Sequence, residues 1–297
     1  MAEDNGGEDE FFADYGDEGV DILDEEEKEP LPSPDQPAVD HTKNDLPKPL
    51  TDNIQSKDGN DSKKRFKTFA EEGQTPNPKV TEAIAKCQEI IDAGQPWTDP
   101  EFPPTAESLV KYGEKPLKRD YEWQRASEIY PQRLCVFNDH INPDDIHQGE
   151  LGNCYFLAVL SACAEVPRRI RNRVKINEIN AAGIYCVTFF VNGVETPVIV
   201  DDYLPVVYGK PAFASTADGA IWPMLFEKAW AKLHGSYQRT KGGQTAHAAQ
   251  HIIGLPAHSF HHENEQEDLK CGREKFWKYL VNFDKKDFLI MGGSNQG

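Results

Sequence analysis

Apolar residues recur at helical spacing near the start of the ordered part of the chain. They occupy every third or fourth position from Val80 to Ile91, after the pair Asn77-Pro78 and before Gly94. An Asn followed by Pro is typical of a helix start, and Gly commonly follows a helix end. The pattern therefore predicts an amphipathic helix with one face to bury.

Three further helices are predicted by the same criterion. Residues 155–166 are apolar on nearly every side, so this helix should be buried. A second helix, with its apolar face over 225–233, should end at Gly235, and a third should span 245–253 before Gly254.

Two runs of β-branched and aromatic residues, 183–191 and 194–200, flank Asn192-Gly193. This dipeptide between two such runs predicts a β-hairpin. Asp201-Asp202 at the end of the second run could be a pair of catalytic carboxylates, but turn and capping chemistry is the favoured interpretation. A final apolar run, 288–291, predicts a buried strand.

Proline shapes the segment 97–104, which we expect to be an extended strap across the domain surface. Residues 123–129 follow as a mixed aromatic and charged anchor.

The net charge of -18 lies mostly at the N-terminus, where residues 1–30 hold 14 Asp and Glu against one Lys. Residues 1–75 have few apolar side chains to offset the entropy cost of ordering, so we expect them to form a disordered acidic tail and linker. Residues 76–297 are expected to form a folded domain. The tail could dock on a basic partner. A nucleic-acid partner is not expected, because the only basic run, from Arg168 to Lys175, is typical of a solvated helix end.

No segment has the length and apolarity of a membrane span, and the acidic N-terminus lacks the pattern of a signal peptide. The six cysteines are scattered without a C-x-x-C pair, so a reducing, cytoplasmic location is expected, with five packing cysteines and one chemical one.

The chemical candidate is Cys154, placed where a turn containing Gly149 and Gly152 gives way to the buried helix. Unpaired amides at a helix N-terminus stabilise a thiolate. Gln148 supplies a neutral donor of the kind that stabilises an oxyanion. A buried structural cysteine at a helix start is the alternative.

His247 and His251 lie four apart on a predicted helix and could face a metal ion, with His258, His261 and His262 nearby. A zinc peptidase would also need Glu after the first histidine, where this chain has Ala248. Surface polar residues are therefore the favoured interpretation of this cluster.

The segment from Gln148 to Leu157 resembles the active-site cysteine motif of the calpain family of intracellular cysteine endopeptidases. Further segments resemble family signatures in the family's order, from about residue 95 to 297. These are 97–104, 123–129, 182–185, 200–205, 225–237 and Gly242-Gly243. Several independent motifs in sequence are very improbable by chance.

The resemblance implies an α+β, papain-like fold, of which this chain holds mainly the helical first subdomain with a β-hairpin. It also implies that Cys154 is the nucleophile, Gln148 contributes to the oxyanion hole, and proteins are the substrates. The family's general-base histidine lies in a Gly-His-Ala context that none of the nine histidines has, and the orienting asparagine is also missing. The chain alone is therefore expected to be an incomplete endopeptidase. A non-catalytic, calpain-like binding or regulatory protein is the alternative.

The family has a calcium site in the first half of its protease domain, formed by backbone carbonyls, an Asp and a Glu. Asp145 matches that Asp, whereas Ala220 stands at the position of the Glu. Loss of a carboxylate should weaken binding of a hard cation, although Asp218 could substitute. Asn153 and Tyr155 also depart from the Asp and Trp that most members carry. Loss of the carboxylate at Asn153 should ease thiolate formation and does not argue against activity.

Overall fold

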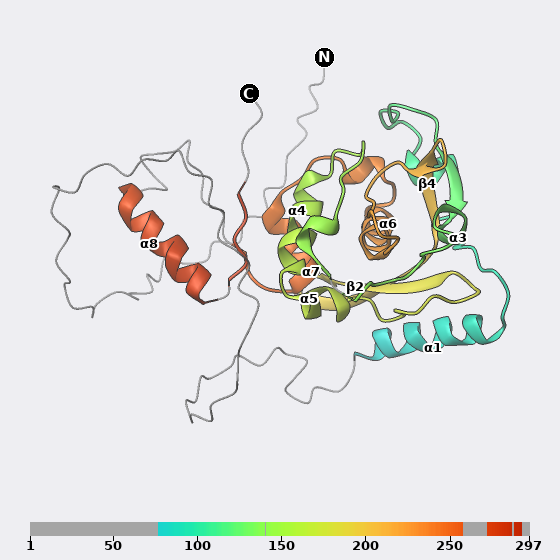
Figure 1. The fold of residues 1–297 in the computed structure, drawn as a ribbon, viewed down its shortest axis with the longest axis horizontal. Helices are drawn as coiled ribbons and strands as arrows, with labels where there is room; N and C mark the ends of the chain where they lie inside the picture. Colours follow the sequence, from blue (N-terminus) through green and yellow to red (C-terminus); the bar gives the residue numbers. More distant parts are fainter. Residues whose placement is uncertain (1–76, 140, 258–271, 287, 293–297) are drawn as a thin grey trace, which may run out of the picture. The chain divides into compact units, whose positions relative to one another are not determined.

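The computed structural model describes residues 77–139, 141–257, 272–286 and 288–292, all within one compact unit that spans 66–297. The predicted acidic tail lies outside the described residues, so the structure does not bear on its docking to a basic partner. Figure 1 shows the order of the elements.

The helices are α1 (Pro78–Asp92), α2 (Ala106–Leu109), α3 (Ala126–Ile129), α4 (Cys154–Ala164), α5 (Pro167–Arg171), α6 (Trp222–His234), α7 (Thr245–Ile253) and α8 (Gly272–Lys285). Two short 3₁₀ helices, η2 (Pro143–Asp145) and η3 (Gln238–Thr240), accompany them. The strands are β1 (Glu122–Arg125), β2 (Ile184–Val191), β3 (Val194–Asp201), β4 (Tyr203–Val207) and β5 (Lys210–Pro211).

The predicted hairpin is confirmed as the antiparallel pair β2–β3, with Ile184 opposite Asp201 and Val191 opposite Val194. Asn192 and Gly193 have φ of 51° and 74°, the left-handed conformation that a two-residue hairpin turn of this kind requires. β3 extends through Asp201, and after Asp202 the chain enters β4. This strand pairs with β1 and β5 in a second antiparallel sheet.

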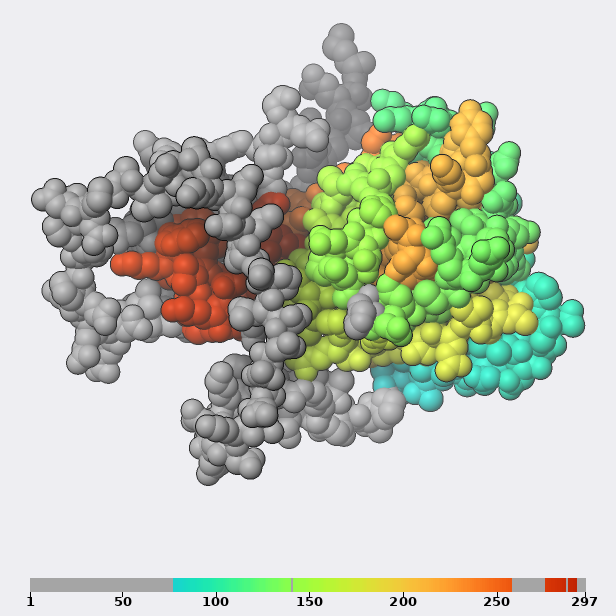
Figure 2. Space-filling view, in the orientation of Figure 1, coloured from blue at the N-terminus to red at the C-terminus, as the bar shows by residue number. Residues whose placement is uncertain are grey.

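The hairpin lies between α1 on one face and α6 and α7 on the other (Figure 1). Ile184 and Cys186 pack into a cluster with Ala83 and Cys87 of α1, whereas Tyr185 and Val187 pack into the main core. Alternate side chains of a strand point to opposite faces, so β2 is buried on both. The space-filling view shows α1, in cyan, bordering the yellow hairpin (Figure 2).

The predicted helices are confirmed with small differences at their ends. Asn77 caps α1 through its side chain, which accepts a hydrogen bond from the Lys79 amide at 3.0 Å. Gly235 ends α6 with φ of 95° and Gly254 ends α7 with φ of 72°. α8 had not been predicted.

Residues 288–291 do not form the predicted buried strand. They have no regular secondary structure, and Phe288 and Ile290 are 58% and 42% exposed. Leu289 and Met291 pack against the main core.

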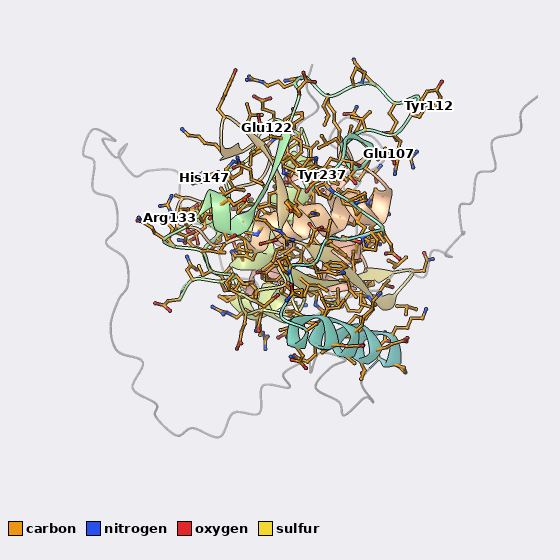
Figure 3. The ribbon with its side chains drawn as sticks, turned by 90° about the vertical axis from the view of Figure 1, so that its right-hand side faces the viewer. Glu107, Tyr112, Glu122, Arg133, His147 and Tyr237 are labelled. Carbon is orange, nitrogen blue, oxygen red and sulfur yellow. The ribbon has the colours of Figure 1, made fainter. Side chains whose placement is uncertain are left out.

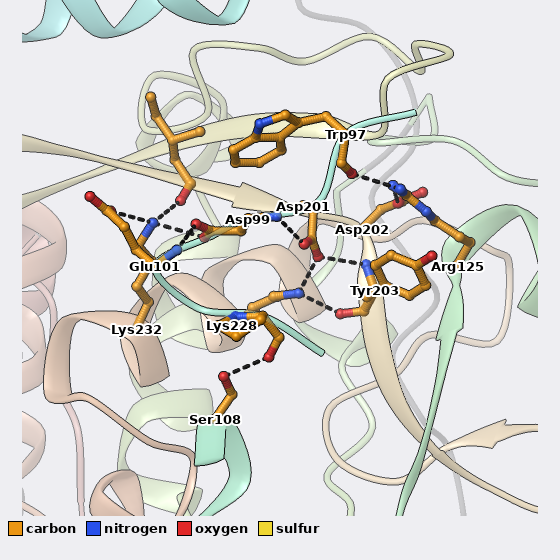
Figure 4. Close-up of polar contacts among 12 residues, drawn as sticks. Trp97, Asp99, Glu101, Ser108, Arg125, Asp201, Asp202, Tyr203, Lys228 and Lys232 are labelled. Carbon is orange, nitrogen blue, oxygen red and sulfur yellow. Dashed lines mark hydrogen bonds and ion pairs between the residues drawn. The ribbon is translucent and has the colours of Figure 1, made fainter. Parts of the chain in front are cut away.

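The segment 97–104, predicted as an extended strap across the surface, has no regular secondary structure and bends at 100–102, and Asp99 and Phe102 are buried. Charged side chains hold its first residues (Figure 4). Lys232 bonds to Asp99 at 2.8 Å and Glu101 at 3.0 Å. The Trp97 carbonyl accepts a hydrogen bond from Arg125 at 2.6 Å.

Asp201 and Asp202 belong to the same network, which supports the structural interpretation of the pair (Figure 4). Asp201 accepts hydrogen bonds from the Asp99 amide at 2.7 Å and from the fully buried Lys228 ammonium. Asp202 pairs with Arg125 at 2.6 Å. The two carboxylates therefore join the strap, both sheets and α6.

The basic run from Arg168 to Lys175 is only partly the predicted solvated helix end. Arg173 and Lys175 follow α5, and both pair with Glu195 of β3, at 3.3 and 3.1 Å. The Arg173 side chain is only 14% exposed. Burial lowers the pKa of Arg173, and the charge of Glu195 opposes that shift.

Candidate active site

Cys154 is the first residue of α4, and its side chain is exposed at the surface. Most of the helix behind it is buried, in line with its apolar sequence, although Ala158 is exposed and Ser161 and Ala162 are partly buried. Phe156 stacks on Trp230 of α6 with ring centroids 4.9 Å apart, and Trp230 Nε1 donates to the Tyr155 hydroxyl at 3.1 Å. This packing fixes the first turn of α4 and therefore the place of the thiol.

The other described cysteines are less accessible than Cys154. Cys87, Cys163 and Cys186 are buried and Cys135 is half-buried. Burial raises the pKa of the Cys163 thiol to about 12. Among the described cysteines, the separation into packing residues and one exposed thiol therefore agrees with the sequence analysis.

The turn before Cys154 lies against the segment 212–215. Backbone hydrogen bonds join His147 and Ser215 in both directions, at 2.9 and 3.0 Å, and the Glu150 amide donates to the Ala212 carbonyl at 3.1 Å. A Cβ at Gly149 would lie 2.3 Å from the carbonyl oxygens of Ala212 and Phe213. Only glycine allows this approach.

Gly152 makes the last bend before the helix with φ of 75°, a conformation that favours glycine. Its carbonyl accepts a hydrogen bond from the Gly242 amide at 3.0 Å. The Gly242-Gly243 pair from the sequence analysis therefore lies beside the turn that leads to Cys154.

Gln148 is exposed and lies on the same turn as Cys154. In Figure 3 its neighbour His147 lies toward the edge of the domain, whereas Tyr237 lies in the packed interior. The side chain of Gln148 is thus open to solvent and not packed into the core.

Asn153 connects the turn to the interior. Its side-chain Nδ2 donates to Glu227 Oε1 at 2.8 Å, and Glu227 Oε2 accepts from the Ala214 amide at 3.0 Å. Burial raises the pKa of Glu227 to about 7, and the bonds from Asn153 and Ala214 oppose that shift. Asn153 makes no side-chain capping bond to α4.

Sequence reasoning missed Glu227. The available signal was a carboxylate on a helix whose neighbours in sequence are otherwise buried, Leu225, Phe226 and Ala229 among them. A charged residue in such a position needs a specific partner.

Three histidines surround Trp230. Ring centroids of His234, His247 and His251 lie 4.1, 6.4 and 5.3 Å from it. Nδ1 of His234 and of His251 each lies 2.9 Å from a backbone carbonyl oxygen of its own helix. Within the described ranges, no group of three or more His, Cys, Asp or Glu side chains is arranged to hold a metal ion. His258, His261 and His262 lie outside those ranges.

The residues at the expected calcium site fit a hard cation poorly. The Asp145 carboxylate caps η2 by accepting from the Asn142 amide at 3.0 Å, and Ala220 is fully buried and offers only a methyl side chain. Asp218, the possible substitute, accepts from the Ala220 amide at 3.1 Å and from the Asn138 side chain.

An exposed thiol at the start of a buried helix, behind a turn with a neutral side-chain donor, is the arrangement that cysteine proteases use for their nucleophile. Residues 97–296 match the family model described as "Calpain family cysteine protease". The chain belongs to that family.

Curated relatives agree with this assignment. The chain is 35% identical to the Calpain-type cysteine protease DEK1 of Arabidopsis thaliana over 211 residues. This alignment covers 68% of the chain and 10% of that relative. It is 35% identical over 179 residues to Calpain-5 of Caenorhabditis elegans, covering 58% of the chain and 27% of the relative. Calpain-B of Drosophila melanogaster is 37% identical over 167 residues, covering 54% and 18%.

The chain therefore spans between a tenth and about a quarter of the length of these relatives. In the described parts, no helix has both the length and the apolar character needed to cross a membrane.

Proposed function

We propose that this chain carries the nucleophile half of a calpain-type cysteine endopeptidase that hydrolyses peptide bonds in proteins within a reducing compartment. The observation that carries the proposal is the exposed Cys154 thiol at the N-terminus of the buried helix α4. Partial positive charge at a helix N-terminus favours the thiolate, which is the reactive form of cysteine.

In the proposed reaction, Cys154 Sγ attacks the scissile carbonyl carbon and forms a tetrahedral oxyanion. The Gln148 side-chain amide donates a hydrogen bond to that oxyanion. Collapse of the intermediate expels the amine and leaves a thioester on Cys154, which water then hydrolyses.

This reaction also needs a base to take the thiol proton and return it to the amine. None of the nine histidines lies in the Gly-His-Ala context of the family. We therefore propose that residues 1–297 do not hydrolyse peptides by themselves, and that the histidine and asparagine come from a further segment.

Family resemblance supports a calcium-dependent peptidase, but with weak calcium binding in this part of the chain. The poor fit of Asp145 and Ala220 supports a first-half calcium site of reduced affinity, because hard cations require several oxygen ligands.

The test is turnover of an unstructured protein substrate by the complete natural protein, with and without calcium. We expect Cys154→Ala to abolish turnover and Cys135→Ser, a change at another thiol, to preserve it. Turnover that survives Cys154→Ala would refute the nucleophile. Turnover by residues 1–297 alone that depends on Cys154 would refute the need for a further segment.

A further inference from the structure

Glu227 is a carboxylate without a cationic partner in the described part of the chain, and it lies at the centre of the structure. The residue is 2% exposed and stands on the buried side of α6. A buried carboxylate is costly unless its oxygens accept hydrogen bonds. Both oxygens of Glu227 do so, and their two donors belong to different segments.

The first donor is Asn153, the residue directly before Cys154. Its Nδ2 lies 2.8 Å from Glu227 Oε1, and the residue is 1% exposed. Because Asn153 precedes α4, this bond fixes the backbone at the point where the helix begins and the thiol is presented.

The second donor is the Ala214 amide, 3.0 Å from Glu227 Oε2. Ala214 belongs to the segment that supports the Gln148 turn through the bonds of Ala212 and Ser215 to Glu150 and His147. One carboxylate thus holds the residue before the thiol and the segment behind the proposed oxyanion donor.

Asn153 has a second relevant atom. Its Oδ1 is buried and has no hydrogen-bond partner in the structure. A buried acceptor without a partner carries a desolvation cost. If the side-chain amide turned by half a rotation, Oδ1 would face Glu227, where it could accept a hydrogen bond from the O–H of a neutral carboxyl group.

We propose that Glu227 is a positioning residue for Cys154, and that the Asn153 amide turns over when Glu227 gains a proton. The inference rests on the proposed role of Cys154 as nucleophile. In the ionised state Glu227 accepts from Asn153 Nδ2 and from Ala214. In the neutral state the carboxyl hydrogen bonds to Asn153 Oδ1, and the turn before Cys154 is held differently.

The surroundings of Glu227 place this change near neutral pH. Burial raises the pKa of Glu227 to about 7 against the effect of its two donors. The titratable group that senses its charge is the buried Tyr237, whose pKa burial raises and the charges of Glu227 and Asp201 raise further. The neighbouring Lys228 is committed to Asp201, and the Lys241 side chain lies against Gly152 at the turn itself.

The experiment measures alkylation of Cys154 by iodoacetamide in the full 297-residue chain from pH 5.5 to 9, by mass spectrometry of the Cys154 peptide. For the unmodified chain we expect a step in the alkylation rate near pH 7, where Glu227 changes its protonation state. Glu227→Gln should remove the step near pH 7 and slow alkylation at pH 8 by about threefold, the size expected when a helix N-terminus holds the thiolate less well.

Glu195→Gln is the control for loss of a carboxylate elsewhere in the fold, because Glu195 is half-buried on the hairpin and pairs there with Arg173 and Lys175. It should keep the step near pH 7. If Glu227→Gln does not fold, Asn153→Ser tests the same bond from the other side and should also remove the step near pH 7. A profile unchanged by either folded variant would overturn the proposal.

This outcome is distinct from failure of the proposed function. Failure of the function would appear as protein turnover that does not depend on Cys154 in the complete protein. Failure of the positioning role would appear in the alkylation profile of Cys154, which needs no catalytic histidine.

Discussion

The ammonium group of Lys228, on α6, is fully buried against the carboxylate of Asp201 at the end of β3. Lys228 also donates to the Tyr203 carbonyl at 2.6 Å, at the first residue of β4. This one side chain therefore fixes the point where the chain leaves the hairpin and enters the second sheet. Burial lowers the pKa of Lys228, and Asp201 opposes the shift.

Removal of one partner of this pair should be strongly destabilising. We expect Lys228→Met to lower the free energy of unfolding by about 3 to 5 kcal/mol, because it leaves the Asp201 charge buried without its cation. Urea denaturation of the 297-residue chain measures the change. Lys228→Met combined with Asp201→Leu should recover part of the loss, whereas an additive loss would show that the two side chains are not coupled.

Glu227 should make stability depend on pH. Its folded pKa of about 7 lies above the ordinary 4.5, so the folded state binds more protons between these values. The stabilisation is complete below about pH 4.5 and is lost as pH rises through 7. Relative to Glu227→Gln, the chain should lose about 3 kcal/mol between these limits. Parallel pH profiles of unfolding free energy for the two chains would contradict this.

Gly149 should tolerate no side chain. Gly149→Ala places a Cβ 2.3 Å from two carbonyl oxygens of the backbone, so the turn must move away from segment 212–215. We expect a loss of about 2 kcal/mol in unfolding free energy, as for other overpacked sites, and slower alkylation of Cys154. Gly292→Ala is the control, since Gly292 has no left-handed φ and a Cβ there would meet nothing within 4 Å. Equal losses in both variants would count against the steric explanation.

Gln148 should matter for turnover rather than for folding, because it is exposed. In the complete natural protein, Gln148→Ala should lower kcat by about a hundredfold, as for loss of an oxyanion donor, with little change in melting temperature. Gln148→Glu should be no better, because a carboxylate repels the oxyanion. Full activity of Gln148→Ala would exclude the assigned role.

Calcium affinity should respond to position 220. Isothermal titration of the 297-residue chain should give weak binding or none, and Ala220→Glu should increase affinity by about tenfold by adding a potential ligand. Ala220→Gln controls for the larger side chain at this buried position. Tight binding before any substitution would show that Asp145 and the backbone suffice.

Local patterns predicted most of the elements. Asn192-Gly193 predicted the hairpin because only a few residue pairs adopt that turn easily, and Asn77-Pro78 predicted the start of α1 for the same kind of reason. The position of Cys154 followed from the change between a glycine turn and an all-round apolar run.

The sequence predictions failed where residues far apart in the chain determine the secondary structure or the exposure of a side chain. The run 288–291 looks like a strand but pairs with no strand in the described residues, and its alternate side chains remain exposed. Arg173 and Lys175 looked solvated because their partner Glu195 lies on another element. α8 is not among the predicted helices, although apolar residues such as Phe276, Leu280 and Phe283 recur in it at helical spacing.

The burial of Glu227 left a signal in the sequence, but its hydrogen-bond partners could not be predicted from it. Its two donors lie 74 and 13 residues away along the chain, and no local pattern joins them. Site chemistry of this kind depends on which segments the fold brings together.

The position of α1 has a practical consequence for anyone who shortens the chain. The family match begins at residue 97, beyond the end of α1 at Asp92, yet Ala83 and Cys87 of that helix cover Ala182, Ile184 and Cys186. A version trimmed to the matched residues would present one face of β2 to water as an apolar strip. Such strips promote aggregation, so a shortened version made for expression should begin before Asn77.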